Sequence, residues 1–495
     1  MLPTRSYRTI RRLVRALLGL FFREVVVEGL EHLPKDRGGL LIAWHPNGLI
    51  DPALMVATLP GQVIFGARHG LFEWPLIGAL MRRMGAVPIY RAMDVAGMSA
   101  AEKKAANEKS LDGLARELAR GSFSALFPEG VSHDLPYLSE IKTGAARLYY
   151  QARCLRGPGS PPPALIPVGL YYDRKNIFRS RVLVKYHPPE VLPADLDVDA
   201  EADEPAHRAA VKGLTARIED RLAQVVGVTD NWETHHLIHR AGKLIRAEME
   251  FRAGSDLHGP DLAETRLAYE RIWTGYRARV ATVPDRVRDV LGRLVRYDRC
   301  LRSLGMKDHE LTGPPRMVSP WLVILFVLQA VAVYLLFPPI LVVGFLINVG
   351  PYWLLKWVTR RVSSARKDEA TVKLLGGALL FPVVWILAGA GALVVHHQVR
   401  ALFPSVPDLP VLVVLSTVAF AVVGGYLALV YSELSAQTYR ALKVRVLRSR
   451  RISLIRQLVG ERAELCTELL RLGDGLDLPG QRLPDGRLVP AADPA

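Results

Sequence analysis

The chain has 495 residues, half of them hydrophobic, and a formal net charge of +16. This length suits two or three compact units, and the basic charge favours an anionic partner, either nucleic acid or anionic lipid. The three cysteines form no CxxC pair, which argues against a disulfide framework and against a zinc ribbon. Strongly apolar sequence between residues 317 and 433 favours lipid over nucleic acid.

Residues 1–23 are expected to form an amphipathic helix on the membrane surface. A short apolar run, Ala16–Phe22, follows several basic residues: Arg5, Arg8, Arg11, Arg12 and Arg15. The run is too short to cross a bilayer and no small-residue cleavage site follows it, so a signal peptide is not expected. Basic residues beside a leucine- and phenylalanine-rich face suit the lipid interface. The alternative is an ordinary amphipathic helix packed on the next domain.

Residues 24–228 alternate strand-like runs with helical stretches, which is typical of an α/β domain with a mostly parallel sheet. The strand-like runs are Glu24–Val27, Leu40–Ala43, Val63–Ala67, Ala86–Ile89, Ser122–Phe127, Leu165–Leu170 and Val182–Lys185. Helices are expected near 53–59, 71–84, 102–119, 143–154 and 205–226.

A helical cytoplasmic segment, 229–316, is expected next, followed by four transmembrane segments within 317–433. The four apolar stretches are Pro320–Leu336, Ile340–Trp357, Leu374–Val395 and Val411–Tyr431. A run of four makes buried core helices a poor alternative. Close helix packing is expected at the glycines in the last two stretches: Gly389, Gly391, Gly424 and Gly425.

The distribution of basic residues predicts the orientation of these spans. The loop before the third span is rich in lysine and arginine, whereas the loop before the fourth carries only Arg400. The positive-inside rule then places both ends of the bundle, and the α/β domain, in the cytoplasm of a bacterial inner membrane or an endoplasmic-reticulum-like membrane. Residues 434–472 are expected to form a basic amphipathic helix, and 473–495 a disordered tail.

The first candidate catalytic motif directly follows the strand Leu40–Ala43. It reads Trp-His-Pro-Asn-Gly-Leu-Ile-Asp-Pro from residue 44 to 52, and its Pro and Asn-Gly residues predict a turn. We expect Asp51 to begin a helix as its N-cap. A turn can bring Asp51 back onto His45, so that a carboxylate holds the histidine as a general base. The alternative is a turn histidine beside an ordinary helix cap.

Two further motifs also follow expected strands. Arg91 ends the segment Gly85–Arg91, and the planar guanidinium suits a phosphate. The other motif, Phe-Pro-Glu-Gly-Val-Ser-His-Asp, spans residues 127–134, and Ile-Lys-Thr-Gly follows at 141–144. A helix beginning beside Lys142 favours an anion, and Gly130 allows a ligand to approach the backbone. Each motif alone also fits a solvated loop at the rim of the sheet.

The fourth motif, Ile-Pro-Val-Gly-Leu-Tyr-Tyr at 166–172, is an apolar strand expected in the core or in a pocket wall. Together, in this order, the four motifs resemble those of the glycerolipid acyltransferase superfamily over about residues 20–190. Five residues separate His45 from Asp51, where the commonest form of the family has four. This spacing, together with Ser132 and the two residues after it, resembles the branch of fungal glycerol-3-phosphate/dihydroxyacetone-phosphate acyltransferases.

The resemblance implies roles for individual residues. His45 is expected to be the general base and Asp51 its partner, while Arg91, Glu129 and Gly130 line the glycerol-phosphate site, with Glu129 orienting an arginine or a hydroxyl. Ser132 and Lys142 are further candidates for substrate binding. The donor is acyl-CoA or acyl-carrier protein, and no cofactor, metal or covalent acyl-enzyme is expected. The chain also carries histidines at 235 and 239, but the glutamate of a zinc-binding H-E-x-x-H motif is absent.

Several readings stay open. In one interpretation the acceptor is glycerol 3-phosphate or dihydroxyacetone phosphate. In the other it is 1-acylglycerol 3-phosphate. A different class of function is a non-catalytic membrane scaffold with a degenerate acyltransferase domain. Nucleic-acid binding is disfavoured because the arginines cluster beside the spans without interleaved aromatic residues. The sequence does not predict the oligomeric state.

Overall fold

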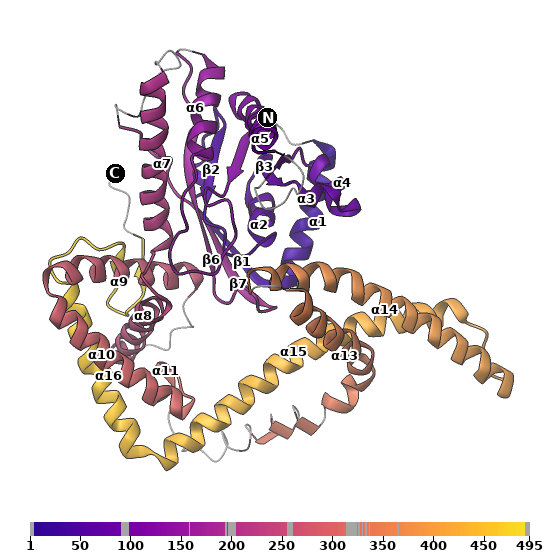
Figure 1. Cartoon of the computed structure of the whole chain (residues 1–495). Helices are drawn as coiled ribbons and strands as arrows, with labels where there is room; N and C mark the ends of the chain where they lie inside the picture. Colours follow the sequence, from indigo (N-terminus) through magenta and orange to yellow (C-terminus); the bar gives the residue numbers. More distant parts are fainter. Residues whose placement is uncertain are drawn as a thin grey trace. The chain divides into compact units, whose positions relative to one another are not determined.

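A computed structural model describes residues 4–90, 99–157, 159–193, 196, 204–254, 261–312, 337–363 and 366–490, with a few positions between 324 and 335. The chain divides into two compact units (Figure 1). The first unit contains Met1–His236, Pro260–Arg266 and Ala365–Thr371. The second unit contains Leu237–Gly259, Leu267–Ser364 and Val372–Ala495.

A seven-stranded sheet forms the centre of the first unit, with strand order β1-β7-β6-β2-β5-β3-β4. All neighbouring strands pair in parallel except β6 and β7, which are antiparallel. Each of the seven predicted runs forms a strand, so the predicted α/β domain with a mostly parallel sheet is confirmed. The strands are β1 (Phe22–Glu28), β2 (Gly39–Ala43), β3 (Val63–Arg68), β4 (Val87–Ile89), β5 (Phe123–Leu126), β6 (Ala164–Tyr172) and β7 (Ser180–Tyr186).

The predicted helices of this unit also form, with one change near residue 75. The stretch predicted as a single helix at 71–84 contains two, because Trp74 adopts an extended conformation ahead of Pro75. The proline ring disfavours helical backbone in the residue before it, but fits the first turn of a new helix. The helices are α2 (Ile50–Thr58), α3 (Gly70–Glu73), α4 (Pro75–Arg83), α5 (Ala100–Ala119), α6 (Gly144–Arg156) and α7 (Glu204–Val226), with a short 3₁₀ turn η1 (Leu30–His32).

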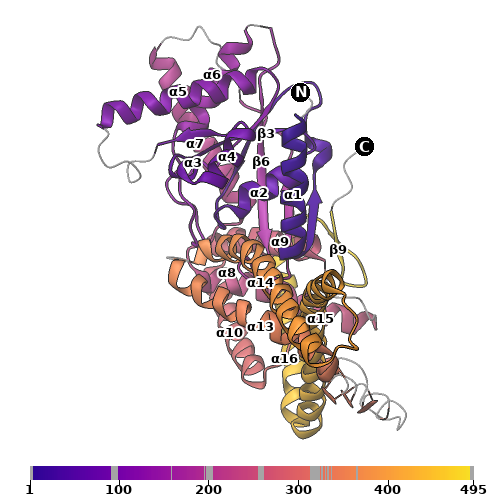
Figure 2. The same ribbon diagram turned by 90° about the vertical axis from the view of Figure 1, so that its right-hand side faces the viewer.

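Helices cover both faces of the sheet. Figures 1 and 2 show α6 and α7 on one face, and α2 with the N-terminal helix α1 (Arg5–Phe21) on the other. Leu40 and Ile42 of β2 are fully buried in a cluster with Leu148 of α6 and Leu214 of α7. Leu41 is buried on the opposite side, as expected from the alternation of side chains along a strand. Strand β2 therefore lies in the core on both faces.

Helix α1 packs on this domain, which was the alternative to a helix lying only on the membrane. Its Tyr7, Leu18 and Phe21 side chains are buried, and two arginines bind the end of α2. Arg11 donates to the carbonyls of Leu59 and Pro60 (3.0 and 2.8 Å), and Arg15 donates to that of Ala57 (2.6 Å). Leu13 and Leu20 remain more than half exposed, so contact with a membrane surface stays a prediction for that face.

The core of the second unit is helical, as predicted for residues 229–316. Its helices are α8 (Trp232–Ala253) and α9 (Leu262–Thr282), both beginning in the first unit, with α10 (Pro284–Leu304), α11 (Asp308–Thr312) and α16 (Ile452–Gly473). Leu244, Leu294 and Leu465 pack together in its core. The fully buried guanidinium of Arg462 pairs with Glu248 (2.9 Å), which satisfies a cation that would be costly to bury alone.

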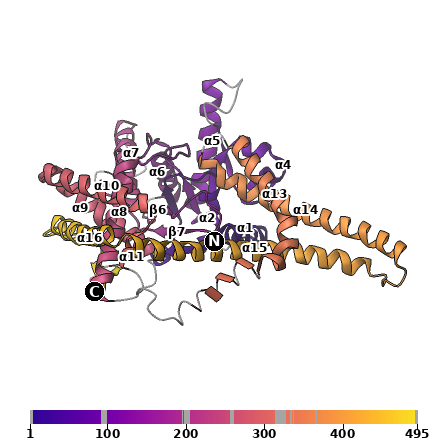
Figure 3. The ribbon, with the colours of Figure 1, turned by 90° about the horizontal axis from the view of Figure 1, so that it is seen from below.

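Three long helices carry the apolar sequence: α13 (Phe337–Val362), α14 (Arg366–Leu402) and α15 (Pro410–Arg450). Figure 3 shows α14 and α15 joined at one end by residues 403–409. Among the described residues, two helices are long and apolar enough to cross a membrane, Asp368–Leu402 and Pro410–Arg450. They contain the third and fourth predicted spans, and α13 contains the second. More than half of the first predicted span lies outside the described residues.

The predicted glycine contacts between these helices form at three of the four positions. The α carbons of Gly424 and Gly344 approach so closely that a Cβ on either would lie 2.5 Å from the other. A Cβ at Gly389 would lie 3.2 Å from Val414, and one at Gly425 would lie 3.1 Å from Asn348. Large side chains elsewhere on α14 and α15 remain exposed, including Ile386, Leu387 and Phe420. Such extended apolar surface indicates association with a membrane.

Two predictions for the C-terminal region are wrong. The helix predicted over 434–472 is divided, because α15 continues to Arg450 and α16 begins at Ile452. Residues 473–495 were predicted to be disordered, yet β8 (Gln481–Arg482) and β9 (Leu488–Val489) form an antiparallel hairpin. Leu488 is buried there, and Arg271 of α9 donates to the carbonyls of 478, 479 and 480. These contacts come from distant sequence, which local composition does not reveal.

Candidate active site

The candidate residues gather at one edge of the sheet. Strand β2 lies between β5 and β6, and the three strands run parallel, so their carboxyl ends meet. The first motif follows β2, the Phe-Pro-Glu-Gly motif follows β5, and the Tyr171-Tyr172 pair ends β6. In open α/β sheets this edge is the usual place for a ligand site.

His45 and Asp51 form a pair, as the turn between them predicted. His45 Nδ1 lies 2.8 Å from Asp51 Oδ2, and the Asp51 side chain is fully buried whereas that of His45 is 13% exposed. Asp51 is not the N-cap, since α2 begins at Ile50 and Leu49 occupies the cap position. Asp51 lies instead in the first turn, where the positive end of the helix dipole stabilises a carboxylate.

The Asp51 carboxylate is held by two further donors. Its Oδ2 accepts from the backbone N–H of Asn47 (2.7 Å), and its Oδ1 accepts from the Tyr172 hydroxyl at the end of β6. Burial, followed by the negative charge of Asp51, raises the pKa of Tyr172 well above its ordinary value, so the phenol stays a neutral donor. A carboxylate fixed at Nδ1 keeps the proton there and leaves Nε2 of His45 as the basic atom.

The third motif packs directly against this histidine. The ring of Phe127 stacks on that of His45, with centroids 4.0 Å apart and an interplanar angle of 13°. The backbone N–H of His133 donates to the carbonyl of His45 (3.1 Å). Two segments separated by about eighty residues in sequence are therefore locked together, and the imidazole is held in one orientation.

Glu129 is buried beside the pair and binds a histidine, not the arginine considered from sequence. Its Oε2 pairs with His133 Nε2 and accepts from the backbone N–H of Ser139 (2.8 Å). In the described part of the chain, its Oε1 is buried and has no hydrogen-bond partner. Because burying an unpaired carboxylate oxygen is costly, this atom is suited to accept a hydrogen bond from a bound hydroxyl.

The other candidates of this motif lie around the same loop. Gly130 has φ +69°, a left-handed conformation that strains other residues. The backbone N–H of Lys142 donates to the carbonyl of Pro128 (2.9 Å), whereas its ammonium group is exposed and pairs with Glu140. Ser132 is half-buried. Lys142 lies two residues before the start of α6, so its predicted position near a helix N-terminus is confirmed.

Two residues at the site were not among the sequence candidates. From the sequence, Tyr172 was expected only in a core or pocket-wall strand, and Lys175 was given no individual role. Lys175 Nζ lies 2.5 Å from Asp134 and donates to the carbonyl of Pro46 (3.0 Å), so it connects two loops of the site. Their position could have indicated a role, because Tyr172 ends β6, Lys175 follows shortly after it, and β6 is adjacent to β2.

Arg91 lies outside the described residues, so its role as a phosphate ligand stays a prediction. Two hydrogen bonds fix the backbone of the preceding residue, Tyr90. The Asn107 side chain of α5 accepts from the Tyr90 N–H and donates to the Tyr90 carbonyl, both at 2.8 Å. Strand β4, which leads to this point, is at the edge of the sheet with β5 and β3 between it and β2.

Comparison with known proteins identifies the domain. Residues 24–170 match the family model Acyltransferase. The chain is 23% identical over 398 residues to an uncharacterized acyltransferase of Schizosaccharomyces pombe, covering 63% of this chain and 56% of the relative. It is 31% identical over 188 residues to glycerol-3-phosphate O-acyltransferase 2 of Saccharomyces cerevisiae (38% of this chain, 23% of the relative). It is also 31% identical over 132 residues to lyso-ornithine lipid O-acyltransferase of Rhizobium meliloti (27% and 39%).

Among solved structures, the chain is similar to the crystal structure of the 1-acyl-sn-glycerophosphate acyltransferase of Thermotoga maritima. The TM-score is 0.30 and the identity 21%, over 44% of this chain and 79% of that one. The curated relatives are matched over between about a quarter and just over half of their own length. The family match identifies residues 24–170 as an acyltransferase domain, and the yeast relative supports a likeness to the glycerolipid acyltransferase superfamily.

Proposed function

We propose that this protein transfers a fatty acyl group from acyl-CoA or acyl-carrier protein to a hydroxyl of glycerol 3-phosphate or dihydroxyacetone phosphate, in phospholipid biosynthesis. The observation that carries this proposal is the pair formed by His45 and the buried Asp51 at 2.8 Å. A histidine held in this way is suited to general-base catalysis near neutral pH.

The proposed step is direct acyl transfer. His45 Nε2 takes the proton of the acceptor hydroxyl while that oxygen attacks the thioester carbonyl carbon. A carbon–oxygen bond forms, the carbon–sulfur bond breaks, and the departing thiolate takes the proton from the imidazolium. Asp51 stabilises the imidazolium during the reaction without taking its proton. The step needs no covalent acyl-enzyme, metal or cofactor.

The acceptor is proposed to bind at the loop after β5. Glu129 Oε1, which has no hydrogen-bond partner among the residues that the structure describes, supports binding of a glycerol hydroxyl there. Gly130, Ser132 and the cationic Lys142 complete this side of the site, and Arg91 supplies the bidentate partner for phosphate.

The protein is proposed to act from the cytoplasmic face of a multi-pass membrane anchor. The exposed apolar helices α14 and α15 support a membrane setting, and the sequence asymmetry of basic residues supports this orientation. A long-chain thioester and a lipid product both concentrate at such a surface, which explains the combination of a catalytic domain with apolar helices.

The relatives favour no single acceptor. The similarity to a yeast protein named glycerol-3-phosphate O-acyltransferase supports the small acceptor, as do the five residues between His45 and Asp51. The similarity to a lyso-ornithine lipid O-acyltransferase supports an acceptor that already carries an acyl chain, for which 1-acylglycerol 3-phosphate is our second candidate. The intact His45–Asp51 pair counts against a non-catalytic scaffold.

A competition assay tests the proposal. Glycerol 3-phosphate and 1-acylglycerol 3-phosphate are offered at equal, subsaturating concentrations with one acyl donor to the purified protein in lipid nanodiscs, and the products are identified by mass spectrometry. We expect lysophosphatidate as the main initial product. Phosphatidate formed at least about tenfold faster would assign the second acylation instead, since tenfold corresponds to about 1.4 kcal/mol of discrimination. Absence of both products with every thioester donor would support the scaffold.

A further inference from the structure

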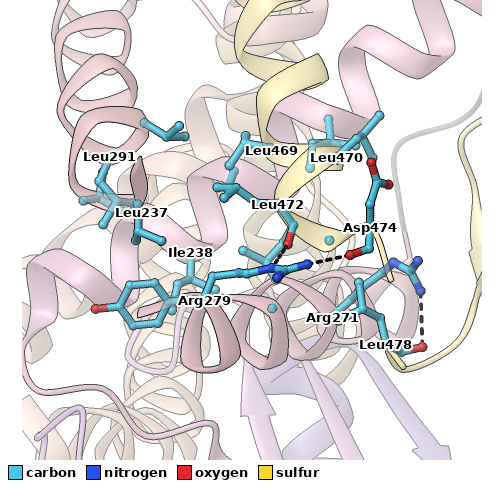
Figure 4. A pocket seen from close by; sticks show the side chains of 18 of the residues that line it. Leu237, Ile238, Arg271, Arg279, Leu291, Leu469, Leu470, Leu472, Asp474 and Leu478 are labelled. Carbon is cyan, nitrogen blue, oxygen red and sulfur yellow. Dashed lines mark hydrogen bonds between the residues drawn. The ribbon is translucent and has the colours of Figure 1, made fainter. Parts of the chain in front are cut away.

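The second unit contains a cavity that no residue of the acyltransferase motifs lines. It has a volume of about 340 Å³ and is walled by α8, α9, α10 and α16. Figure 4 shows its aliphatic lining, which includes Leu237, Leu291 and Leu469. A cavity of this volume is at the lower end of the range of small-molecule sites, roughly 300–1,000 Å³. Its branched aliphatic walls suit a flexible hydrocarbon chain.

Two arginines line the same cavity and bind backbone carbonyls of the C-terminal segment. Arg279 donates to the carbonyls of Leu472 (2.8 Å) and Asp474 (2.5 Å), as Figure 4 shows. Arg271 donates to those of Leu478, Pro479 and Gly480. Burial lowers the pKa of Arg271. Since carbonyl oxygens carry no formal charge, these contacts satisfy donors without neutralising the two cations. Arg482 and the exposed Asp474 also line the cavity, so its lining keeps an excess of positive charge that would stabilise an anion.

We infer that this cavity binds a single-chain anionic amphiphile, with its hydrocarbon chain among the leucines and its carboxylate or phosphate beside Arg279 and Arg271. Both a free fatty acid and a lysophospholipid have this chemistry. A neutral single-chain lipid has the same chain but lacks the charge that the arginines recognise. The inference does not depend on the proposed acyl transfer, because no residue of the His45–Asp51 site takes part in it.

Gly275 of α9 provides a way to fill the cavity. It lines the space, and a Cβ at this position would lie 3.7 Å from Leu478, which is an ordinary contact. Gly275→Leu can therefore be accepted at the backbone while its branched end occupies the volume meant for the chain. Gly460 of α16 is a matched control, since it is helical and exposed, and a Cβ there would have no atom within 4 Å.

The test is photo-crosslinking of the full-length protein in lipid nanodiscs. Three probes carry the same diazirine-bearing chain: palmitate, 1-palmitoyl lysophosphatidate and neutral monopalmitoylglycerol. We expect one or both anionic probes to label peptides of α8, α10 or α16 and the neutral probe to label them at least about tenfold less. The more efficient of the two anionic probes identifies the natural source of the ligand. Excess unlabelled palmitate or lysophosphatidate should compete in the wild-type protein.

The variants then test the position and the charge. Gly275→Leu should abolish labelling of these peptides, whereas Gly460→Leu should leave it unchanged. Arg279→Gln should weaken labelling by the anionic probes, and Arg279→Lys should retain most of it because the charge remains. Equal labelling by all three probes, or labelling that excess unlabelled ligand does not reduce in the wild-type protein, would overturn the inference. Competition by unlabelled ligand in the wild-type protein tests the inference even if Gly275→Leu fails to fold.

Discussion

The Tyr172 hydroxyl donates a hydrogen bond to Oδ1 of Asp51, the carboxylate whose other oxygen lies 2.8 Å from His45 Nδ1. The last residue of β6 thus supports a histidine that follows β2. Because Tyr172 acts through Asp51 and not on the reacting atoms, we regard it as a positioning residue. Its role should be visible in the pH dependence of the reaction as well as in the rate.

Replacing Tyr172 by Phe should lower kcat about tenfold with little change in KM, and reduce stability by about 1–3 kcal/mol, because a buried carboxylate oxygen loses its donor. With one donor fewer, Asp51 stabilises the imidazolium more, so the acid limb of the kcat/KM profile should move to higher pH. Tyr171→Phe is the matched control, since its hydroxyl donates to Val225 (2.7 Å) instead. An unchanged pH profile with lower activity would indicate a purely structural role.

Replacing His45 by Ala should lower acyl transfer by roughly 10²–10⁴-fold, the usual contribution of a positioned general base. The variant should still fold, because His45 lies in a turn at the rim of the sheet, but its thermal midpoint should fall because the buried Asp51 loses a hydrogen-bond donor. His236→Ala, at an exposed position of α8, should leave the rate unchanged. Near-normal turnover by a folded His45→Ala protein would exclude the proposed mechanism.

Arg91→Lys keeps the positive charge but loses the planar fork that forms two parallel hydrogen bonds to phosphate. We expect the KM for the acceptor to rise about tenfold while the KM for the acyl donor changes little. Steady-state kinetics with each substrate varied in turn make this comparison. Arg83→Lys, at an exposed position of α4, serves as the control. Equal effects on both substrates would assign Arg91 a structural role.

The orientation of α14 and α15 is testable by cysteine labelling in a variant without Cys154, Cys300 and Cys466. Val362→Cys and Ser405→Cys place single thiols at exposed positions on either side of the third predicted span. With an impermeant maleimide on intact cells, we expect labelling at 405 alone, and labelling at 362 after permeabilisation. The reverse pattern would place the catalytic domain away from cytoplasmic thioester donors.

His187, next to the sheet, should make folding sensitive to acid. Burial, assisted by the positive charges of Lys185, Arg221, Arg266 and His32, lowers the pKa of His187 to about 3. An unfolded histidine titrates near 6.5, so between pH 6.5 and 3 the unfolded state binds more protons and stability falls as the pH falls. The loss should reach about 2 kcal/mol by pH 5.

Thermal unfolding of wild-type and His187→Gln proteins at pH 7.5 and 5 measures this effect. The midpoint of the variant should fall less than that of the wild type between the two values. His207→Gln, at an exposed position of α7, should follow the wild type. Parallel losses in all three proteins would show that other groups cause the acid sensitivity.

The sequence was sufficient where local pattern determines structure. The seven strands of the sheet and the turn that returns Asp51 to His45 were predicted, because alternating apolar runs and Pro/Asn-Gly turns leave few alternatives. Tyr172 and Lys175 were not identified as site residues, because their importance depends on β6 lying beside β2. That pairing joins segments more than a hundred residues apart, and no local signal encodes it.

The C-terminal region shows the same limit. Its Gly, Pro and Asp content suggested disorder, but Arg271 and Arg279 of α9 bind its carbonyls and order the hairpin that follows. Composition describes the tendency of an isolated segment, whereas these contacts depend on a helix two hundred residues earlier. The division between α15 and α16 at Arg451 likewise lacks a proline or glycine that would have indicated it.

The contacts of α1 bear on how far the catalytic domain can be shortened. Helix α2 carries Asp51 in its first turn, and Arg11 and Arg15 bind the free carbonyls at its other end. The stretch recognised as the family's own, starting at residue 24, lacks both guanidiniums. A fragment cut at that boundary would lose the arginines that bind the end of α2, the helix that carries Asp51. A truncated or fused version of the α/β domain should therefore begin with α1, not at residue 24.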